Sequence, residues 1–304
     1  MSSQKSDHML LALGSMFAQQ TFISLGKSLP AVIAPAIIAD LKLAPAWIGI
    51  YFGLTAVAAL FSQLGCGSFI VRYGALRMSQ IALLLLAVGI ACLTLGSPAI
   101  LVLSAIVSGG GAAVSTPSSS HLLSRVSTPQ YLPLVFSIKQ TAVPVGLLFA
   151  GMVAPKFAEI AGWRTTMLIC ASACIVFALV LQPLRKLFDD DRVPTRTFKL
   201  SDFKTTYVAV TATKRLRALS FACLAFNGVQ TVITAYFVVY LTTIGYTPVA
   251  AGFMFSIAVG VAIPGRILWG WVGSRYLSPR VVMAGLSLGM AVSAVLLAPW
   301  DRTS

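Results

Sequence analysis

Long apolar runs dominate this chain and restrict what it can fold into. Nine runs are long enough to cross a hydrocarbon core of about 30 Å as helices that rise about 1.5 Å per residue. They lie roughly at 11–37, 47–69, 78–96, 99–124, 133–155, 164–183, 216–240, 248–271 and 280–299. With 58% hydrophobic and 10% charged residues, the chain holds more apolar side chains than a soluble domain of this length can bury. The sequence therefore predicts an all-α polytopic membrane protein.

Lys and Arg residues are distributed unequally over the predicted loops, and this asymmetry predicts an orientation. Fifteen of them lie on the side of the N-terminus, whereas only Lys42, Lys156, Arg164 and Arg302 lie on the other side. Because cationic loops resist translocation, we expect the N-terminus and the long central loop in the cytoplasm, at the inner membrane of a bacterium. A basic surface facing anionic lipid headgroups also accounts for the net charge of +14 without a nucleic-acid partner.

The chain also matches itself after a shift of 203 positions. The matching pairs are Pro45 and Pro248, Gly49 and Gly252, Phe52 and Phe255, Gly67 and Gly270, Arg72 and Arg275, and Arg77 and Arg280. Such self-similarity between hydrophobic segments in the same order indicates two repeats of parallel orientation. With an offset of 203, only 101 of the 304 residues remain for the second repeat. These residues correspond to the first three of the six spans in the first repeat. We expect a six-helix N-terminal bundle at 1–183, a cytoplasmic linker at 184–215 and three helices of a C-terminal bundle at 216–304.

A motif recurs in the short loops after the second and eighth runs. The loops read Gly67-Ser-Phe-Ile-Val71-Arg72-Tyr-Gly74-Ala-Leu-Arg77 and Gly270-Trp-Val-Gly-Ser274-Arg275-Tyr-Leu-Ser-Pro-Arg280. A small residue would let two helices approach closely, and the cations would hold the turn against phosphates and helix C-termini. The motif resembles the G-x-x-x-D-R-x-G-x-x-R loop of the major facilitator superfamily, at both of the places where that family carries it. The resemblance covers the whole chain and includes the stretch 109–164.

The resemblance implies a secondary transporter that moves a small solute by rocking two bundles about a site at the bilayer midplane. The glycines and arginines of the two loops would form part of its gate. In the family an acid pairs with the following Arg and a helix end, but this chain has Val71 and Ser274 there, so we expect gating to be retuned or weakened. The Arg that drug/proton antiporters carry in the fourth span corresponds to Ala105, and their span-five motif G-P-x-x-G-G is reduced to 144–146. The resemblance thus disfavours proton-coupled drug efflux.

Polar side chains inside the predicted spans indicate the transport pathway, because burial of such groups in lipid is unfavourable. One stripe lies on a face of the first span and a second stripe on the seventh, at positions equivalent by the repeat. The predicted cavity residues are Gln20, Ser24, Lys27, Lys139, Gln140, Asn227, Gln230, Thr234 and Arg266. Alternative roles are polar contacts between helices, snorkelling of Lys27 and Lys139 towards the headgroups, and a gating role for Arg266.

The charges inside the spans predict the class of substrate. Lys27, Lys139 and Arg266 lie within spans, whereas all eight Asp and Glu residues fall in loops or at span ends. Because an unpaired cation in a low dielectric attracts an anion, we expect a small organic anion such as a carboxylate. An enzyme is not expected, since no nucleophile motif occurs and no span holds an acid that could act as a base. The cysteines and the two histidines form no metal pattern, and no cofactor is expected.

The incomplete second repeat predicts a functional consequence. Without counterparts of spans ten to twelve, part of the cavity wall would be absent, so we expect impaired transport by this chain alone. The apolar surfaces of spans seven to nine would then face lipid or a partner chain that supplies the remaining helices. The alternative is a non-transporting membrane scaffold or regulator that pairs with another chain through its half-bundle.

Overall fold

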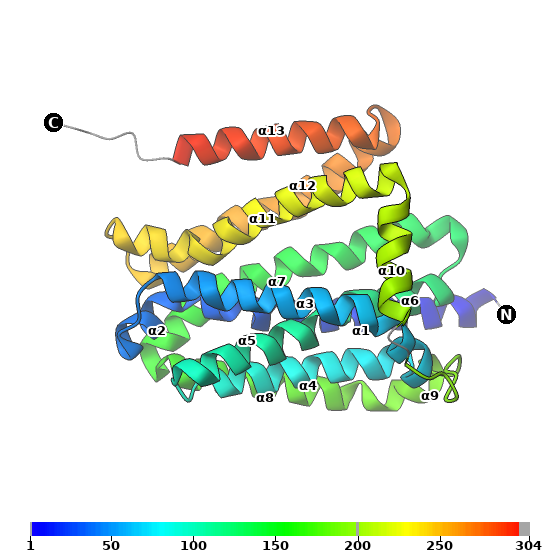
Figure 1. Cartoon of the computed structure of the whole chain (residues 1–304), viewed down its shortest axis with the longest axis horizontal. Helices are drawn as coiled ribbons and strands as arrows, with labels where there is room; N and C mark the ends of the chain where they lie inside the picture. Colours follow the sequence, from blue (N-terminus) through cyan, green and yellow to red (C-terminus); the bar gives the residue numbers. More distant parts are fainter. Residues whose placement is uncertain (1, 199–200, 298–304) are drawn as a thin grey trace.

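The computed structural model describes residues 2–198 and 201–297, and within these ranges the chain contains helices and no strand (Figure 1). Eight helical segments are long and apolar enough to cross a membrane. The ninth predicted span is helix α13 (Pro279–Leu297), in which the shorter apolar stretch is Val281–Ser293. The prediction of an all-α polytopic membrane fold is therefore confirmed.

The first six predicted spans pack into a bundle around one apolar core. Its helices are α1 (Ser2–Val32), α2 (Ala34–Leu41), α3 (Ala46–Tyr73), α4 (Ala75–Leu93), α5 (Pro98–Ala113), α6 (Ser115–Val126), α7 (Leu132–Ala161) and α8 (Trp163–Val180). Leu83, Leu86 and Met167 are fully buried in its centre. Two of the predicted spans are interrupted, at Ile33 and at Val114, because a proline follows each position closely and cannot donate a backbone hydrogen bond.

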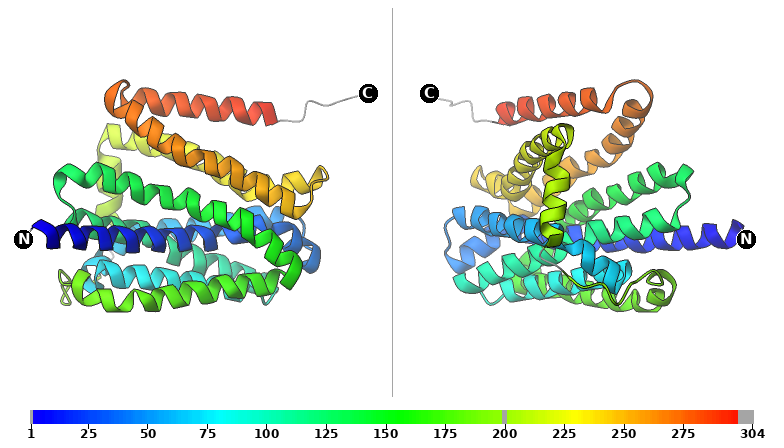
Figure 2. Two further views of the ribbon diagram at one scale, coloured as in Figure 1. Left: turned by 180° about the vertical axis from the view of Figure 1, so that it is seen from behind. Right: turned by 45° about the vertical axis from the view of Figure 1, so that its right-hand side comes forward.

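The central loop and the second repeat continue from the bundle. After the short helices η2 (Gln182–Leu184) and α9 (Arg185–Phe188), the chain reaches α10 (Ser201–Ala212), which runs across the direction of the spans (Figure 1). Helices α11 (Lys214–Thr243) and α12 (Pro248–Arg275) lie beside the bundle, and α13 lies beyond them (Figure 2). The domain boundaries at 183 and 215 stay a prediction.

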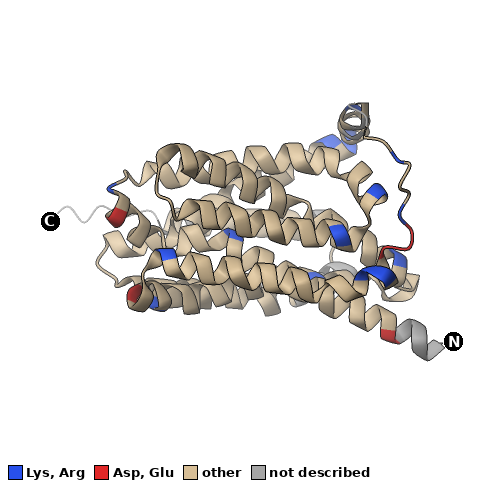
Figure 3. Ribbon diagram, turned by 90° about the horizontal axis from the view of Figure 1, so that it is seen from below, with Lys and Arg blue, Asp and Glu red and all other residues tan. Residues whose placement is uncertain are grey.

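The charged residues distinguish the two ends of the molecule. Lys and Arg residues gather at the end where the N-terminus lies, here called the basic end (Figure 3). Arg72, Arg125 and Arg185 contact the chain between 188 and 196 there. At the opposite end, Arg164 forms an ion pair of 2.7 Å with Asp40. This arrangement gives the bundle the asymmetry on which the predicted orientation rests.

The two repeats touch each other near the opposite end and separate towards the basic end. Helices α7 and α12 converge at the opposite end in two views (Figures 1 and 2). The buried residues of α11 lie within 235–241, and none of its residues from 214 to 234 is buried. In α12 the buried residues lie within 251–256, and no residue after them with a described side chain is buried. The buried contacts between the repeats are therefore concentrated towards the opposite end.

Candidate functional site

Three of the predicted cavity residues lie inside the N-terminal bundle instead of facing open space. Gln20, Ser24 and Lys139 are 5%, 6% and 1% exposed. Ser115 Oγ donates towards Gln20 Oε1 at 2.9 Å, and a Cβ at Gly146 would lie 2.7 Å from the Cβ of Ser24. In this structure these side chains join α1 and α7 to their neighbours, which is the alternative that the sequence left open.

Lys139 is the clearest of these cases because its ammonium group is satisfied within the bundle. Its Nζ donates to the carbonyl of Thr116 at 3.1 Å and to Ser120 Oγ at 2.8 Å, and it lies 5.9 Å from the centre of the Phe136 ring. The two acceptors and the aromatic ring offset part of the cost of burying the ammonium group. Lys139 therefore links α7 to α6 and offers no free charge to a ligand.

Lys27 has the opposite environment although it belongs to the same residue type. It lies well inside the first span, yet its side chain is exposed while Gly26 and Ser28 on either side are buried. Lys27 makes no hydrogen bond or ion pair with any residue that the structure describes. Because a cation at this depth is unfavourable unless an anion or water accompanies it, Lys27 is the strongest ligand-binding candidate in the chain.

The polar stripe of the second repeat is exposed or half-buried, and its place in a cavity stays a prediction. Asn227 and Gln230 are exposed and Thr234 is half-buried. Asn227 Nδ2 donates to the carbonyl of Cys223 at 2.8 Å, and Thr234 Oγ1 donates to that of Gln230 at 2.8 Å. Cys223 stands one turn before Asn227 on the same face, and it is the exposed one among the five cysteines. This face of α11 offers neutral polar groups and one exposed thiol.

Arg266 connects the two repeats across the basic half of the molecule. Its Nη1 donates to the main-chain carbonyl of Gln140 at 3.1 Å, whereas the side chain of Gln140 is exposed. The guanidinium thus holds α12 to α7 at a level where the helices otherwise separate. This contact agrees with the gating alternative for Arg266 better than with a free binding charge.

The repeated loop motif has the side chains of its arginines described in its first copy, whereas the second copy is described mainly in its backbone. Its Arg72 Nη1 donates to the carbonyl of Arg196 at 3.4 Å, Arg77 is half-buried, and Gly74 has φ +95°. The expected close approach of two helices at Gly67 is wrong for the described residues, since no atom lies within 4 Å of the place that a Cβ would take. The side chains of Arg275 and Arg280 and the surroundings of Gly270 lie outside what the structure describes.

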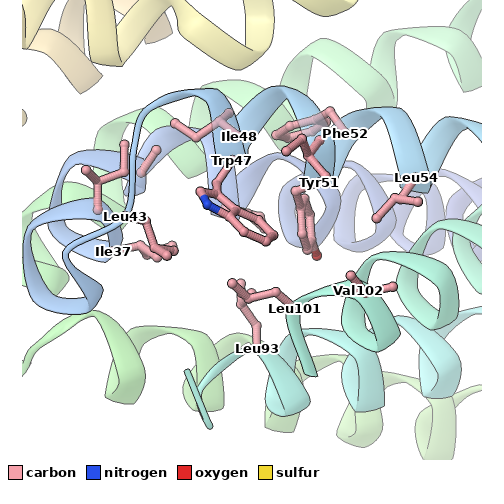
Figure 4. A pocket seen from close by; sticks show the side chains of 14 residues that line it. Ile37, Leu43, Trp47, Ile48, Tyr51, Phe52, Leu54, Leu93, Leu101 and Val102 are labelled. Carbon is pink, nitrogen blue, oxygen red and sulfur yellow. The ribbon is translucent and has the colours of Figure 1, made fainter. Parts of the chain in front are cut away.

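An apolar pocket lies near the opposite end, between α3, α5 and the turn that contains α2 (Figure 4). Trp47, Leu93 and Leu101 are among its lining residues. The hydroxyl of Tyr51 is already bonded to Ser104 and Ser108, at 3.3 Å each. No charged side chain lines the pocket, so it offers no partner for an anion, and the candidate site lies at Lys27 instead.

Sequence reasoning missed one polar contact beside the site. Gln19 is fully buried, and its Oε1 lies 3.0 Å from Ser115 Oγ, next to the contact of Gln20. The polar stripe of the first span runs through 20, 24 and 27, and Gln19 is outside that spacing, so periodicity alone could not find it. No group of three or more potential metal-binding side chains occurs among the described residues.

Comparison with known proteins agrees with this architecture. The family model of the Major Facilitator Superfamily matches residues 16–304. One similar solved structure is a bacterial homologue of the human lysosomal transporter Spinster in an inward-facing and occupied conformation, with a TM-score of 0.62 and 19% sequence identity. The match covers 88% of this chain and 62% of that one, so the chain spans less than two thirds of its length. Comparison with the curated proteins gives no match. From the extent of the family match and the fold, the chain belongs to the major facilitator superfamily.

Proposed function

We propose that this chain serves in secondary transport of a small organic anion, for which Lys27 is the binding charge. The observation that carries the proposal is Lys27 itself, an exposed residue inside a span and without a partner among the described residues. The carboxylate of the substrate would accept a charge-assisted hydrogen bond from it. The other two cations of the spans are engaged, Lys139 with α6 and Arg266 with α7.

The neutral polar groups on α11 would complete the site from the second repeat. Helices α1 and α11 contact each other, and the described polar face of α11 is exposed in its basic half. Amide and hydroxyl groups such as those of Asn227 and Thr234 can bind the uncharged part of an organic acid. In alternating access, a rocking motion of the repeats would move this site between the two sides of the membrane.

The orientation follows from the same charge distribution. The basic end would face the cytoplasm, because loops rich in Lys and Arg resist translocation. We therefore propose a location in the inner membrane of a bacterium, with the N-terminus and the basic end in the cytoplasm.

A substrate panel tests the proposed class. The protein is reconstituted into liposomes with each of four labelled solutes in turn: a monocarboxylate, a dicarboxylate, a neutral sugar and an organic cation. Slow uptake of at least one carboxylate above protein-free liposomes is expected, since transport by this chain alone is expected to be impaired, with no uptake of the sugar or the cation. Uptake of the sugar or the cation without that of a carboxylate would overturn the proposed substrate class.

A scaffold role remains the second proposal because of the exposed C-terminal helices. None of the residues of α13 with a described side chain is buried, so a large apolar surface is free for lipid or for a partner chain. Purification in mild detergent distinguishes the two functions. A single membrane protein that co-purifies in equal amount, together with an inactive substrate panel, would favour the scaffold.

A further inference from the structure

The central linker covers the loop motif of the first repeat at the position where the motif lacks its acid. Val71 has an exposed side chain there, and its carbonyl accepts a hydrogen bond of 2.8 Å from the amide of Val193. Arg72, the next residue, reaches the carbonyl of Arg196. The linker is thus bonded to the motif at the position of the missing carboxylate and at the residue that follows it.

Asp189, at the start of this linker segment, brings a carboxylate into contact with the loop motif of the first repeat. The residue is 5% exposed, and its two carboxylate oxygens accept the backbone amides of Leu76 at 2.8 Å and Arg77 at 3.0 Å. These amides belong to the first turn of α4, where amides have no acceptor within the helix and negative charge is favourable. Asp189 therefore caps α4 from a position 113 residues away in the chain.

Gly74 makes this contact possible. It adopts φ +95°, which favours glycine, and a Cβ on it would overlap the carboxyl group of Asp189. The Gly of the motif in this chain therefore leaves room for the acid from the linker. Arg185, one turn before Asp189, approaches the same carboxylate at 3.6 Å.

The residues after Asp189 add contacts to another helix of the bundle. Arg125 on α6 pairs with Asp190 and lies 3.0 Å from Asp191, and His121 lies 2.9 Å from Asp191. The hydrogen bond from Arg125 lowers the pKa of Asp190. Burial raises the pKa of Asp189, against the opposing effect of the two amides and Arg185.

Aromatic contacts extend the attachment as far as α10. The Phe198 ring lies 5.2 Å from that of Phe69 on α3 and 5.7 Å from that of Phe203 on α10. The ring of Phe203 in turn packs against Gly65, at the place that a Cβ would take. The linker from 189 to 203, apart from the two residues outside the description, follows the basic end of the bundle.

From these contacts we propose that Asp189 is a positioning residue of the gate, which supplies from the linker the negative charge that the motif lacks at position 71. It fixes the start of α4 and fastens the linker to the N-terminal bundle. Rocking motions of the second repeat would then be transmitted to the motif through the linker. The proposal goes beyond the anion substrate and holds for any solute that the protein carries.

Hydrogen exchange measures the attachment directly. In Asp189→Ala the amides of Leu76 and Arg77 lose their acceptor. The amide hydrogens in peptides that cover 70–78 and 189–196 should therefore exchange at least ten times faster than in the original protein. Asp189→Asn retains one acceptor oxygen and should give a smaller increase in the same peptides. The matched control is Asp190→Asn, which changes a neighbouring acid that pairs with Arg125; exchange over 70–78 should be unchanged.

The gating role needs a readout that a merely structural contact would not alter. The alkylation rate of Cys223 in membranes reports how far the repeats are open at the basic end. Asp189→Ala should change this rate at least threefold, and adding Val71→Asp to the same chain should restore it. The proposal is overturned if Asp189→Ala leaves the exchange of 70–78 unchanged, if Asp190→Asn matches its effect, or if Val71→Asp restores nothing. None of these outcomes depends on the substrate, so they are separate from a failure of the anion proposal.

Discussion

Replacement of Lys27 by glutamine is expected to weaken the binding of a small carboxylate by about ten- to a hundredfold. A hydrogen bond to a charged group contributes about 1.5–3 kcal/mol, which corresponds to that range of affinity. Glutamine preserves a hydrogen-bond donor and removes the charge, so the loss reports the charge itself. The measurement is equilibrium binding of the best carboxylate of the panel to the purified protein.

The control for this variant is Lys42→Gln. Lys42 is exposed at the end of α2, between two spans, and a change there removes the same charge at a distance from the site. Its affinity for the carboxylate should equal that of the original protein. Equal binding by the Lys27 variant and the original protein would remove Lys27 from the site.

Alanine at Gly252 should destabilise the contact between the two repeats by about 1–3 kcal/mol, the range seen when atoms are added to a tightly packed interface. A Cβ at Gly252 would lie 2.5 Å from the carbonyl oxygen of Gly151 and 2.5 Å from Cγ of Pro155. These atoms belong to α7 and its backbone, which cannot move without shifting the helix. We expect a lower melting temperature in detergent and separation of α7 from α12.

Gly265→Ala is the matched control for this prediction. Gly265 lies on the same helix, and nothing lies within 4 Å of the place of its Cβ. Because alanine favours the helix over glycine by about 1 kcal/mol, this variant should be unchanged or slightly more stable. A similar loss of stability in both variants would show that the approach of Gly151 and Gly252 is not what holds the repeats together.

The helices could be predicted from the sequence because the bilayer imposes them. An apolar run must satisfy its backbone polar groups within itself, so run length and hydropathy are sufficient to place a span. The interruptions at Ile33 and Val114 depend on local backbone geometry, and a proline nearby predicts only that a kink is possible. The prediction for Gly67 failed because a small residue permits a close approach but does not supply the second helix.

The sequence predicted a set of candidate residues for the site but not the role of each residue. Lys27 and Lys139 both appear in the sequence as cations within spans, yet one is exposed and the other is 1% exposed. The difference arises from Ser120 and from the carbonyl of Thr116, which reach Lys139 from another helix. The role of Asp189 likewise could not be predicted from the sequence, where it is an acid in a loop, because its partners lie 113 and 112 residues away. Contacts of this kind depend on tertiary packing and leave no local pattern.

The most direct test of an anion site that opens at the basic end uses the native thiol of Cys223. In sealed vesicles with the basic end outward, a membrane-impermeant maleimide should alkylate Cys223, and a saturating carboxylate should slow the reaction severalfold. The neutral sugar should leave the rate unchanged. Alkylation only from the other side, or equal protection by sugar and carboxylate, would contradict the account.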